Sequence, residues 1–224
     1  MKILLDILHD SKIIKLDIGY DLFNLLSKST TSLNLTNFDT SKVTDMSDMF
    51  ANGTALESLD LSDFDTSSTV NMRGMFLSCN SLTSLDVSNF NTSNVTDMNS
   101  MFCDCSGLTE LDLSSFDTSN VTDMSGMFGA CNSLTELDLS NFNTSAVTDM
   151  RYMFYDCCSL TELDLSNFDL SNFDLNNVTK MNSMFGGCKK LKSIYVTNCN
   201  ADTVEKIKHA VAEAGLSETI IKVK

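Results

Sequence analysis

The chain has 224 residues and a formal net charge of -15, contains neither proline nor tryptophan, and is 42% hydrophobic. The acidic balance argues against nucleic acid or an anionic membrane as a partner, because both call for clustered Lys and Arg side chains that replace counterions on phosphate. No stretch approaches the roughly 18 uninterrupted apolar residues of a membrane-spanning helix, so we expect no membrane insertion.

Residues 1–30 do not match the repeat that follows and are predicted to form an N-terminal cap. Residues 13–18 are suited to a strand, and residues 20–27 contain enough apolar positions for a short helix. Residues 1–10 do not fit a signal peptide, because Asp6 interrupts the apolar run and no small-residue cleavage site follows. An atypical terminal unit is expected, since the end of a repeat array otherwise exposes its core.

A repeating unit fills residues 31–198. Its Met-Phe pair places phenylalanine at positions 50, 76, 102, 128, 154 and 185, so the interval is 26 residues four times and then 31. A fixed interval in this range is typical of a solenoid, in which each unit contacts only its neighbours. The five extra residues fall where Ser-Asn-Phe-Asp-Leu is doubled, and we predict a bulged surface loop at 169–177.

Each unit is predicted to supply one short parallel strand, an Asx-type turn and a short helix or 3₁₀ segment. In one copy, Leu137 and Leu139 alternate as in a strand, whereas Val147, Met150 and Phe154 have the spacing of one helical face. The fold class predicted is therefore an α/β repeat solenoid that is leucine-rich-repeat-like. Seven parallel strands about 4.8 Å apart would extend it by about 29 Å.

Residues 199–224 are predicted to form a C-terminal cap with a helix and a last strand. Asp202 and Glu205 have the spacing of a capping box, apolar residues follow at helical intervals, and Gly215 is suited to the helix end. Residues 219–223 then have the pattern of a strand. With the cap at 1–30 and the repeats at 31–198, the chain is predicted to be a single elongated domain.

An acidic strip is predicted on the exposed face of the strands. The residue between the two inward-pointing leucines of each strand points outward, and a second outward position lies two residues earlier. Like charges at this spacing cost stability, so the strip is either a solvated face or a binding surface. Its members are Asp60, Asp86, Glu110, Asp112, Glu136, Asp138, Glu162 and Asp164.

Cysteine recurs at one position of the unit, just after the Met-Phe pair. A disulfide ladder or a metal site is one interpretation, since neighbouring coils lie within disulfide reach. Burial as free thiols is favoured, because an odd number of cysteines cannot pair internally and the spacing is not that of a zinc site. The paired methionines are likewise assigned to the core. This cysteine column comprises Cys79, Cys105, Cys131, Cys157 and Cys188.

The sequence offers few candidate catalytic residues, and we expect no enzyme activity, no cofactor and no metal centre. His9 and His209 are the only histidines and lie in opposite caps, and neither a nucleophile paired with a base nor a glycine-rich phosphate loop is present. The chain instead has the composition of a binding or structural module.

The units, for example residues 108–128 with the sequence Leu-Thr-Glu-Leu-Asp-Leu-Ser-Ser-Phe-Asp-Thr-Ser-Asn-Val-Thr-Asp-Met-Ser-Gly-Met-Phe, resemble the repeats of BspA-like leucine-rich-repeat surface proteins. The resemblance covers residues 31–198. It implies a surface or secreted protein that adheres to host proteins or other cells, and it carries over no catalytic residues.

Three functions follow as expectations. The first is a non-enzymatic adhesion scaffold that recognises a protein or glycan on another cell through the acidic strip. The second is a receptor-binding component of a phage or secretion particle, and the third is a structural spacer without ligand. A cell-surface or extracellular location is implied by resemblance, while the missing signal peptide keeps a virion or the cytoplasm as alternatives. Weak calcium binding by the strip is a further alternative, because carboxylate oxygens suit this ion although the calcium-loop pattern is missing.

Overall fold

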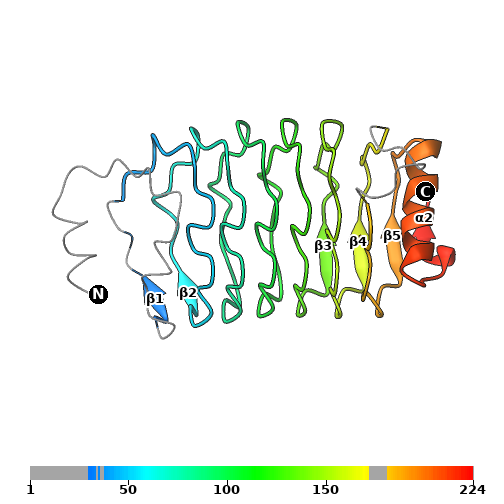
Figure 1. Cartoon of the computed structure of the whole chain (residues 1–224), viewed down its shortest axis with the longest axis horizontal. Coiled ribbons are helices and arrows are strands. Elements are labelled where there is room, and N and C mark those ends of the chain that lie inside the picture. The colour runs from blue at the N-terminus through cyan, green and yellow to red at the C-terminus, as the bar shows by residue number, and fades with distance from the viewer. Residues whose placement is uncertain (1–29, 34, 36–37, 172–180, 224) are drawn as a thin grey trace.

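The protein is a row of similar coils lying side by side along its long axis, as the computed structural model shows (Figure 1). The structure describes residues 30–33, 35, 38–171 and 181–223. Residues 1–29 of the predicted N-terminal cap and residues 172–177 of the predicted loop lie outside the described residues. Helix α2 (Ala201–Glu213) lies at the end of the row opposite to the N-terminal coils.

Parallel strand pairing connects equivalent positions of successive units. Strand β1 (Ser32–Leu33) pairs with β2 (Ser58–Leu59) at an offset of one unit. A second sheet has the order β3-β4-β5-β6 and is parallel throughout, with Glu136 opposite Glu162 at its first pair. Its strands are β3 (Glu136–Asp138), β4 (Glu162–Asp164), β5 (Ser193–Tyr195) and β6 (Ile221–Lys222). The predicted repeat register is therefore confirmed for these strands.

The prediction of one strand in every coil is only partly right. Among the described residues, 84–86 and 110–112 carry the leucine pattern but form no strand. The backbone bond between these two coils on this side, from Thr109 N to Thr83 O, is 3.4 Å long, beyond the usual range for such a bond. These coils are joined mainly by a second set of backbone bonds on another side of the coil.

That second set forms a ladder of turns where a short helix was predicted. Alternate amides donate to the next coil, for example Met98 N to Asp123 O at 3.0 Å and Phe102 N to Met127 O at 2.9 Å. In each coil two residues four apart have positive φ, such as Ser100 at 55° and Asp104 at 59°. Positive φ interrupts a right-handed helix, so the expected helix is replaced by successive turns. We call the segments 45–53, 71–79, 97–105, 123–131, 149–157 and 181–188 the turn ladder.

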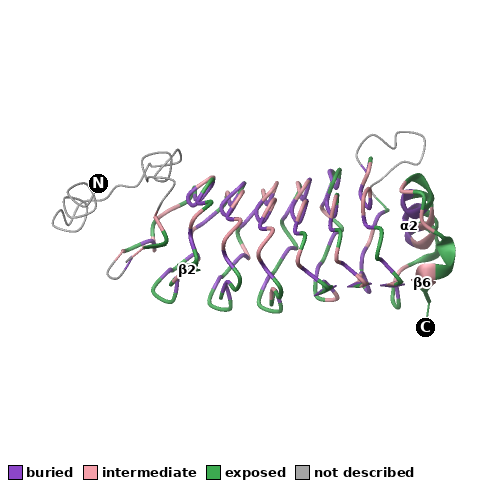
Figure 2. Cartoon of the chain, turned by 90° about the horizontal axis from the view of Figure 1, so that it is seen from below, coloured by how far each residue is buried: buried purple, intermediate pink, exposed green. Residues whose placement is uncertain are grey.

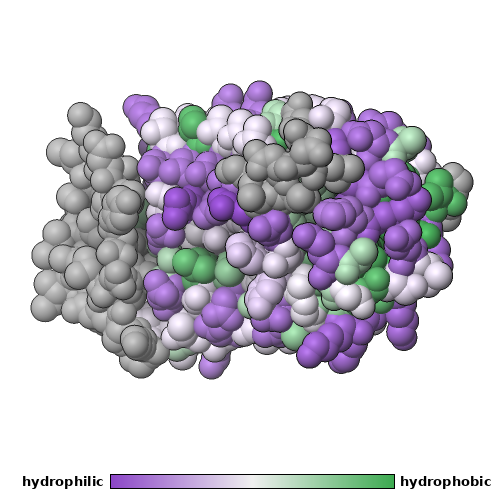
Figure 3. Space-filling model, turned by 45° about the vertical axis from the view of Figure 1, so that its right-hand side comes forward, coloured by the Kyte–Doolittle hydropathy of each residue, from purple (hydrophilic) through white to green (hydrophobic). Residues whose placement is uncertain are grey.

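The apolar residues that suggested a helix are nevertheless the core. Phe102 and Phe128 are fully buried and their rings stack with centroids 5.9 Å apart, as do the equivalent phenylalanines along the row. Figure 2 shows buried segments recurring in each coil, and the face in view in Figure 3 is largely hydrophilic with small separate apolar areas. The spacing of three and four residues therefore identified buried positions correctly but not the backbone conformation.

A buried threonine in five of the Asx turns also connects neighbouring coils. Thr92 is 1% exposed, and its Oγ1 donates to Asp117 O at 2.9 Å while accepting from Asp117 N at 2.8 Å. The hydroxyl thus satisfies both backbone groups of the residue one coil further on. The same pair of bonds occurs at Thr40, Thr66, Thr118 and Thr144.

The C-terminal helix begins two residues earlier than predicted. Asn200, not Asp202, is its N-cap, and the Asn200 side chain accepts a hydrogen bond from Thr203 N. Gly215 follows the helix with φ of 72°, as expected for a helix end. The 3₁₀ turn η2 (Glu218–Ile220) then leads into β6, so the last strand is shorter than predicted. Within the described residues, no helix has the length and apolarity needed to cross a membrane.

Candidate functional site

A groove of about 620 Å³ lies along the predicted acidic strip. Its base is formed by Leu85, Leu111, Leu137 and Leu163, which are the middle residues of the strands or of the equivalent segments. Tyr195 lies at the end of the groove nearest to the C-terminus. Seven of the eight strip residues line it, whereas Asp60 does not. The lining carboxylates are Asp86, Glu110, Asp112, Glu136, Asp138, Glu162 and Asp164.

The two columns of the strip differ in their hydrogen bonding. Each aspartate accepts a bond from the backbone amide two residues later, as Asp138 does from Ser140 N at 2.9 Å, and this bond closes the turn after the strand. The side chains of Glu110, Glu136 and Glu162 are exposed and make no hydrogen bond or ion pair within the described part of the chain. The aspartates are therefore structural as well as acidic, while the glutamates are available to a ligand.

Hydrogen bonds lower the pKa of two aspartates in this column. The pKa of Asp86 is lowered by the hydroxyl of Ser88, whose oxygen lies 2.7 Å from Asp86 Oδ1, and by the Ser88 amide. The pKa of Asp112 is lowered first by the amide of Ser114. Since both groups already ionise near pH 4 in model peptides, the groove carries negative charge at neutral pH.

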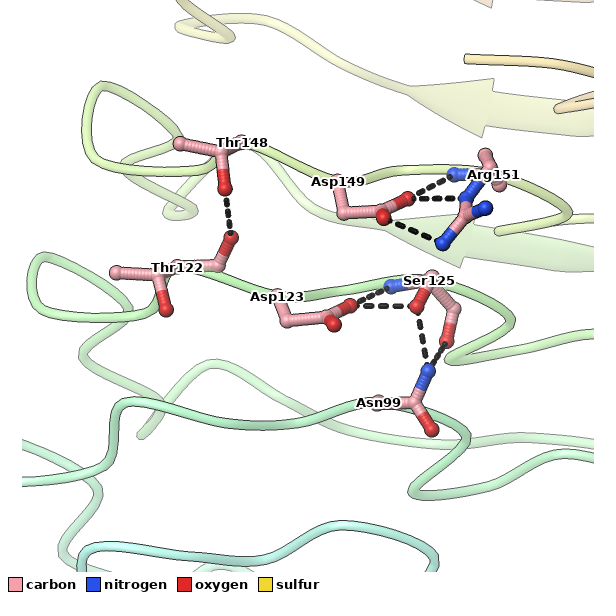
Figure 4. Close-up of polar contacts among 7 residues, drawn as sticks. All are labelled: Asn99, Thr122, Asp123, Ser125, Thr148, Asp149 and Arg151. Carbon is pink, nitrogen blue, oxygen red and sulfur yellow. Dashed lines mark hydrogen bonds and ion pairs between the residues drawn. The ribbon is translucent and has the colours of Figure 1, made fainter. Parts of the chain in front are cut away.

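The turn ladder carries a second column of acidic residues, which the sequence interpretation missed (Figure 4). Asp97, Asp123 and Asp149 occupy equivalent positions joined by isolated parallel bridges. Burial raises the pKa of Asp97, with a further contribution from the charge on Asp123. Asp149 is 3% exposed and binds the guanidinium of Arg151 through both carboxylate oxygens, with Nε–Oδ1 of 2.9 Å and Nη2–Oδ2 of 2.7 Å.

Next to Arg151 lies an exposed pair of tyrosines that the sequence interpretation also missed. Tyr152 and Tyr155 are 49% and 41% exposed, and their rings meet edge to face with centroids 5.7 Å apart. Tyr152 has φ of 60°, a conformation that costs a residue with a side chain about 1–2 kcal/mol. Alignment of the units against one another would have revealed the pair, because the corresponding positions hold Gly126 and Gly129 one coil earlier.

The cysteine column is buried, as predicted. The sulfur of Cys105 lies 3.1 Å from Phe76 O, and each column cysteine makes the same contact with the phenylalanine carbonyl of the preceding coil. Burial raises the pKa of Cys79 to about 12, so this thiol is protonated at neutral pH. The described residues contain no group of three or more His, Cys, Asp or Glu side chains arranged to hold a metal ion. Low thiol reactivity of the column remains a prediction.

Comparison with known proteins gives a family match and several distant structural similarities. A family model described as "Mycoplasma protein of unknown function, DUF285" matches residues 20–111, 83–192 and 162–220. A leucine-rich repeat protein from Bacteroides ovatus is 20% identical with a TM-score of 0.30, and the match covers 66% of this chain and 51% of that one. The functional domain of InlJ from Listeria monocytogenes, which includes a cysteine ladder, is 20% identical with a TM-score of 0.22, covering 80% and 47%. The chain thus spans about half the length of either solved structure. The comparison with curated proteins gave no match.

Proposed function

The chain belongs to the DUF285 family of repeat proteins, and from this premise we propose that it is a non-enzymatic binding scaffold whose acidic groove recognises a protein or glycan. The observation that carries the proposal is the coincidence of the groove with the acidic strip. A concave surface lined by ionised carboxylates attracts a cationic partner over a distance and fixes its register on contact.

The fold supports this function through repetition. Successive coils bring the same outward positions to one face, so that Glu110, Glu136 and Glu162 form one column and Asp112, Asp138 and Asp164 another. We propose a leucine-rich-repeat-like solenoid of the BspA-like type that acts at a cell surface or outside the cell. A receptor-binding component of a phage or secretion particle would use the same groove, whereas a structural spacer would not.

Charge reversal in the groove tests the proposal. Glu136→Lys with Asp138→Lys removes the turn bond from Ser140 N but should leave the coils folded, because the buried core and the turn ladder are unchanged. It should weaken binding to a cationic probe protein such as cytochrome c about tenfold or more, because attraction is replaced by repulsion at the centre of the groove. Binding by the wild type should weaken as salt rises. Surface plasmon resonance over a salt series measures both effects, and circular dichroism checks the fold.

A matched variant separates the groove from the overall charge. Asp65→Lys with Asp117→Lys makes the same change in net charge at two exposed turn aspartates outside the groove lining. This control should retain most of the affinity. Equal losses in the two double variants would show that only net charge matters and would contradict a site in the groove.

A melting temperature that rises with calcium and falls with chelator in the wild type but not in the groove variant would favour calcium as the ligand.

A further inference from the structure

We propose that Tyr152, Tyr155 and Arg151 form a shallow binding site for a neutral carbohydrate, separate from the acidic groove. None of these residues lines the groove. They lie in the turn ladder, on another side of the coil. The proposal is independent of the function assigned to the groove.

The tyrosine rings are exposed although the fold gains little from their position. Among the described residues, only Val70, Tyr152, Tyr155 and Val223 are large hydrophobic residues with substantial exposure, and the tyrosines are the two in mutual contact. Tyr152 also holds a positive φ that glycine adopts without strain. Positive φ recurs at this position in the other described coils, where Asp, Gly or Ser holds it, so the repeat sets the backbone conformation. What distinguishes this coil is the pair of half-exposed aromatic rings placed on that backbone.

Small residues on both sides leave the rings accessible. The positions equivalent to Tyr152 and Tyr155 are Gly126 and Gly129 in the preceding coil, and glycine also follows on the other side at Gly186. A Cβ on Gly186 would lie 2.9 Å from Cδ2 of Tyr155, so this ring lies directly over the glycine. The neighbouring positions are therefore Gly126 and Gly129 on one side and Ser183 and Gly186 on the other, and none of them carries a long side chain that could cover the rings.

The guanidinium of Arg151, the residue before Tyr152, is held in one orientation and is still exposed. Two bonds to the buried Asp149 fix its orientation, while 44% of the Arg151 side chain remains accessible. A guanidinium has five N–H donors, more than these two bonds use. The ion pair with Asp149 is neutral overall, which favours an uncharged ligand with hydroxyl acceptors over an anion.

The size and chemistry of the patch fit a sugar better than a folded protein. Two half-exposed tyrosines offer roughly 200 Å² of ring surface, about a quarter of what one partner contributes to a standard protein interface. Sugar rings have an apolar C–H face that stacks on aromatic rings and hydroxyls at the rim that accept hydrogen bonds. One or two sugar units would cover the tyrosines and reach Arg151.

Binding of neutral oligosaccharides tests the site. We expect at least one member of a panel of cellohexaose, maltohexaose, chitohexaose and N-acetyllactosamine to bind weakly, as measured by saturation-transfer NMR and calorimetry, with an affinity that does not change with salt. Tyr152→Gly combined with Tyr155→Ala should weaken that binding about tenfold or more through loss of both stacking surfaces.

Two further variants distinguish an effect on folding from an effect on sugar binding. Tyr152→Gly alone removes the positive-φ strain, so its melting temperature should equal or exceed that of the wild type while sugar binding falls. Tyr195→Phe, on the groove side, serves as the control and should bind sugar normally. The proposal is overturned if no sugar of the panel binds, if the double tyrosine variant binds as the wild type does, or if sugar binding is lost in Glu136→Lys with Asp138→Lys instead.

Discussion

Two similar Asx turns in this chain place aspartates in environments that move their pKa values in opposite directions. Asp60 is exposed, and its pKa is lowered by bonds from the Ser62 hydroxyl and amide. Asp97 closes a similar turn by accepting from Asn99 N at 2.8 Å, but its partial burial raises its pKa. The same local motif therefore favours the charged carboxylate at one site and disfavours it at the other.

Replacing Asp97 by asparagine should stabilise the protein at neutral pH. Asn71 occupies the equivalent position one coil earlier and accepts the same amide bond, from Arg73 N at 3.0 Å, so the turn is retained. A raised pKa means that the charged form is disfavoured in the folded state, a cost that is present above the folded pKa and disappears as the carboxyl is protonated. The expected gain is a few tenths of a kcal/mol, reduced by solvent screening. Urea unfolding at pH 7 and below pH 4 measures it.

Asp60→Asn is the matched control with the opposite sign. A lowered pKa contributes stability above the unfolded pKa, and this contribution is lost as pH falls through the folded pKa. This variant should therefore be less stable than the wild type at pH 7, and the difference should diminish in acid. Stabilisation by both substitutions at neutral pH would mean that general repulsion in a chain of charge -15, rather than local environment, governs the effect.

At the scale of single elements, α2 is attached to the backbone of Leu170 through a buried lysine. Lys206 is 4% exposed, and its Nζ donates to Leu170 O at 2.8 Å and lies 2.6 Å from Asp202 Oδ2. Thr203 Oγ1 accepts from Leu170 N at 3.0 Å. Both backbone groups of Leu170 are thus bonded by side chains of the helix, which covers the end of the core.

Lys206→Met should reduce the free energy of unfolding by about 1–3 kcal/mol. The loss follows from leaving the buried Leu170 carbonyl without its donor, even though methionine preserves the apolar part of the side chain. Lys208→Met is the control in the same helix, because Lys208 pairs with exposed Glu205 at the surface, and it should change stability by less than about 0.5 kcal/mol. Denaturant unfolding of the two variants compares them directly, and equal effects would contradict a role of Lys206 in attaching the helix.

At the scale of the whole molecule, the structure consists of interactions between neighbouring coils. Backbone bonds of the turn ladder, phenylalanine stacking and the threonine bonds all connect residues about 26 positions apart. In such an array, stability is close to a sum of unit and neighbour contributions. The chain length can therefore change in whole units without altering the remaining contacts.

Deletion of one whole unit should yield a shorter folded protein. Removing residues 109–134 joins Leu108 to Thr135 and keeps the phase of every column, whereas removing residues 109–121 joins Leu108 to Thr122 and shifts the columns by half a unit. We expect the first variant to unfold cooperatively at a lower temperature than the wild type and the second to fail to fold, as measured by circular dichroism during heating. A folded half-unit deletion would show that the columns do not require a common phase.

Sequence alone determined the repeat length, the register of the paired strands, and which leucines, methionines, phenylalanines and cysteines are buried. It succeeded because a constant interval brings the same residue to the same place in successive coils. It also located the acidic strip, since strand alternation separates inward from outward positions.

Tertiary structure decided the backbone of the turn ladder, the extent of the strands and the tyrosine patch. Positive φ recurs at one position of the unit whether the residue is Asp48, Gly74, Ser100 or Tyr152, so residue type does not reveal it. Backbone amides that would bond within a helix instead donate to carbonyls of the next coil. These acceptors lie 25 residues later in the sequence, so local sequence does not reveal them. For the same reason Asp97 acquires its raised pKa and the rings of Tyr152 and Tyr155 stand exposed only after the neighbouring coils are in place.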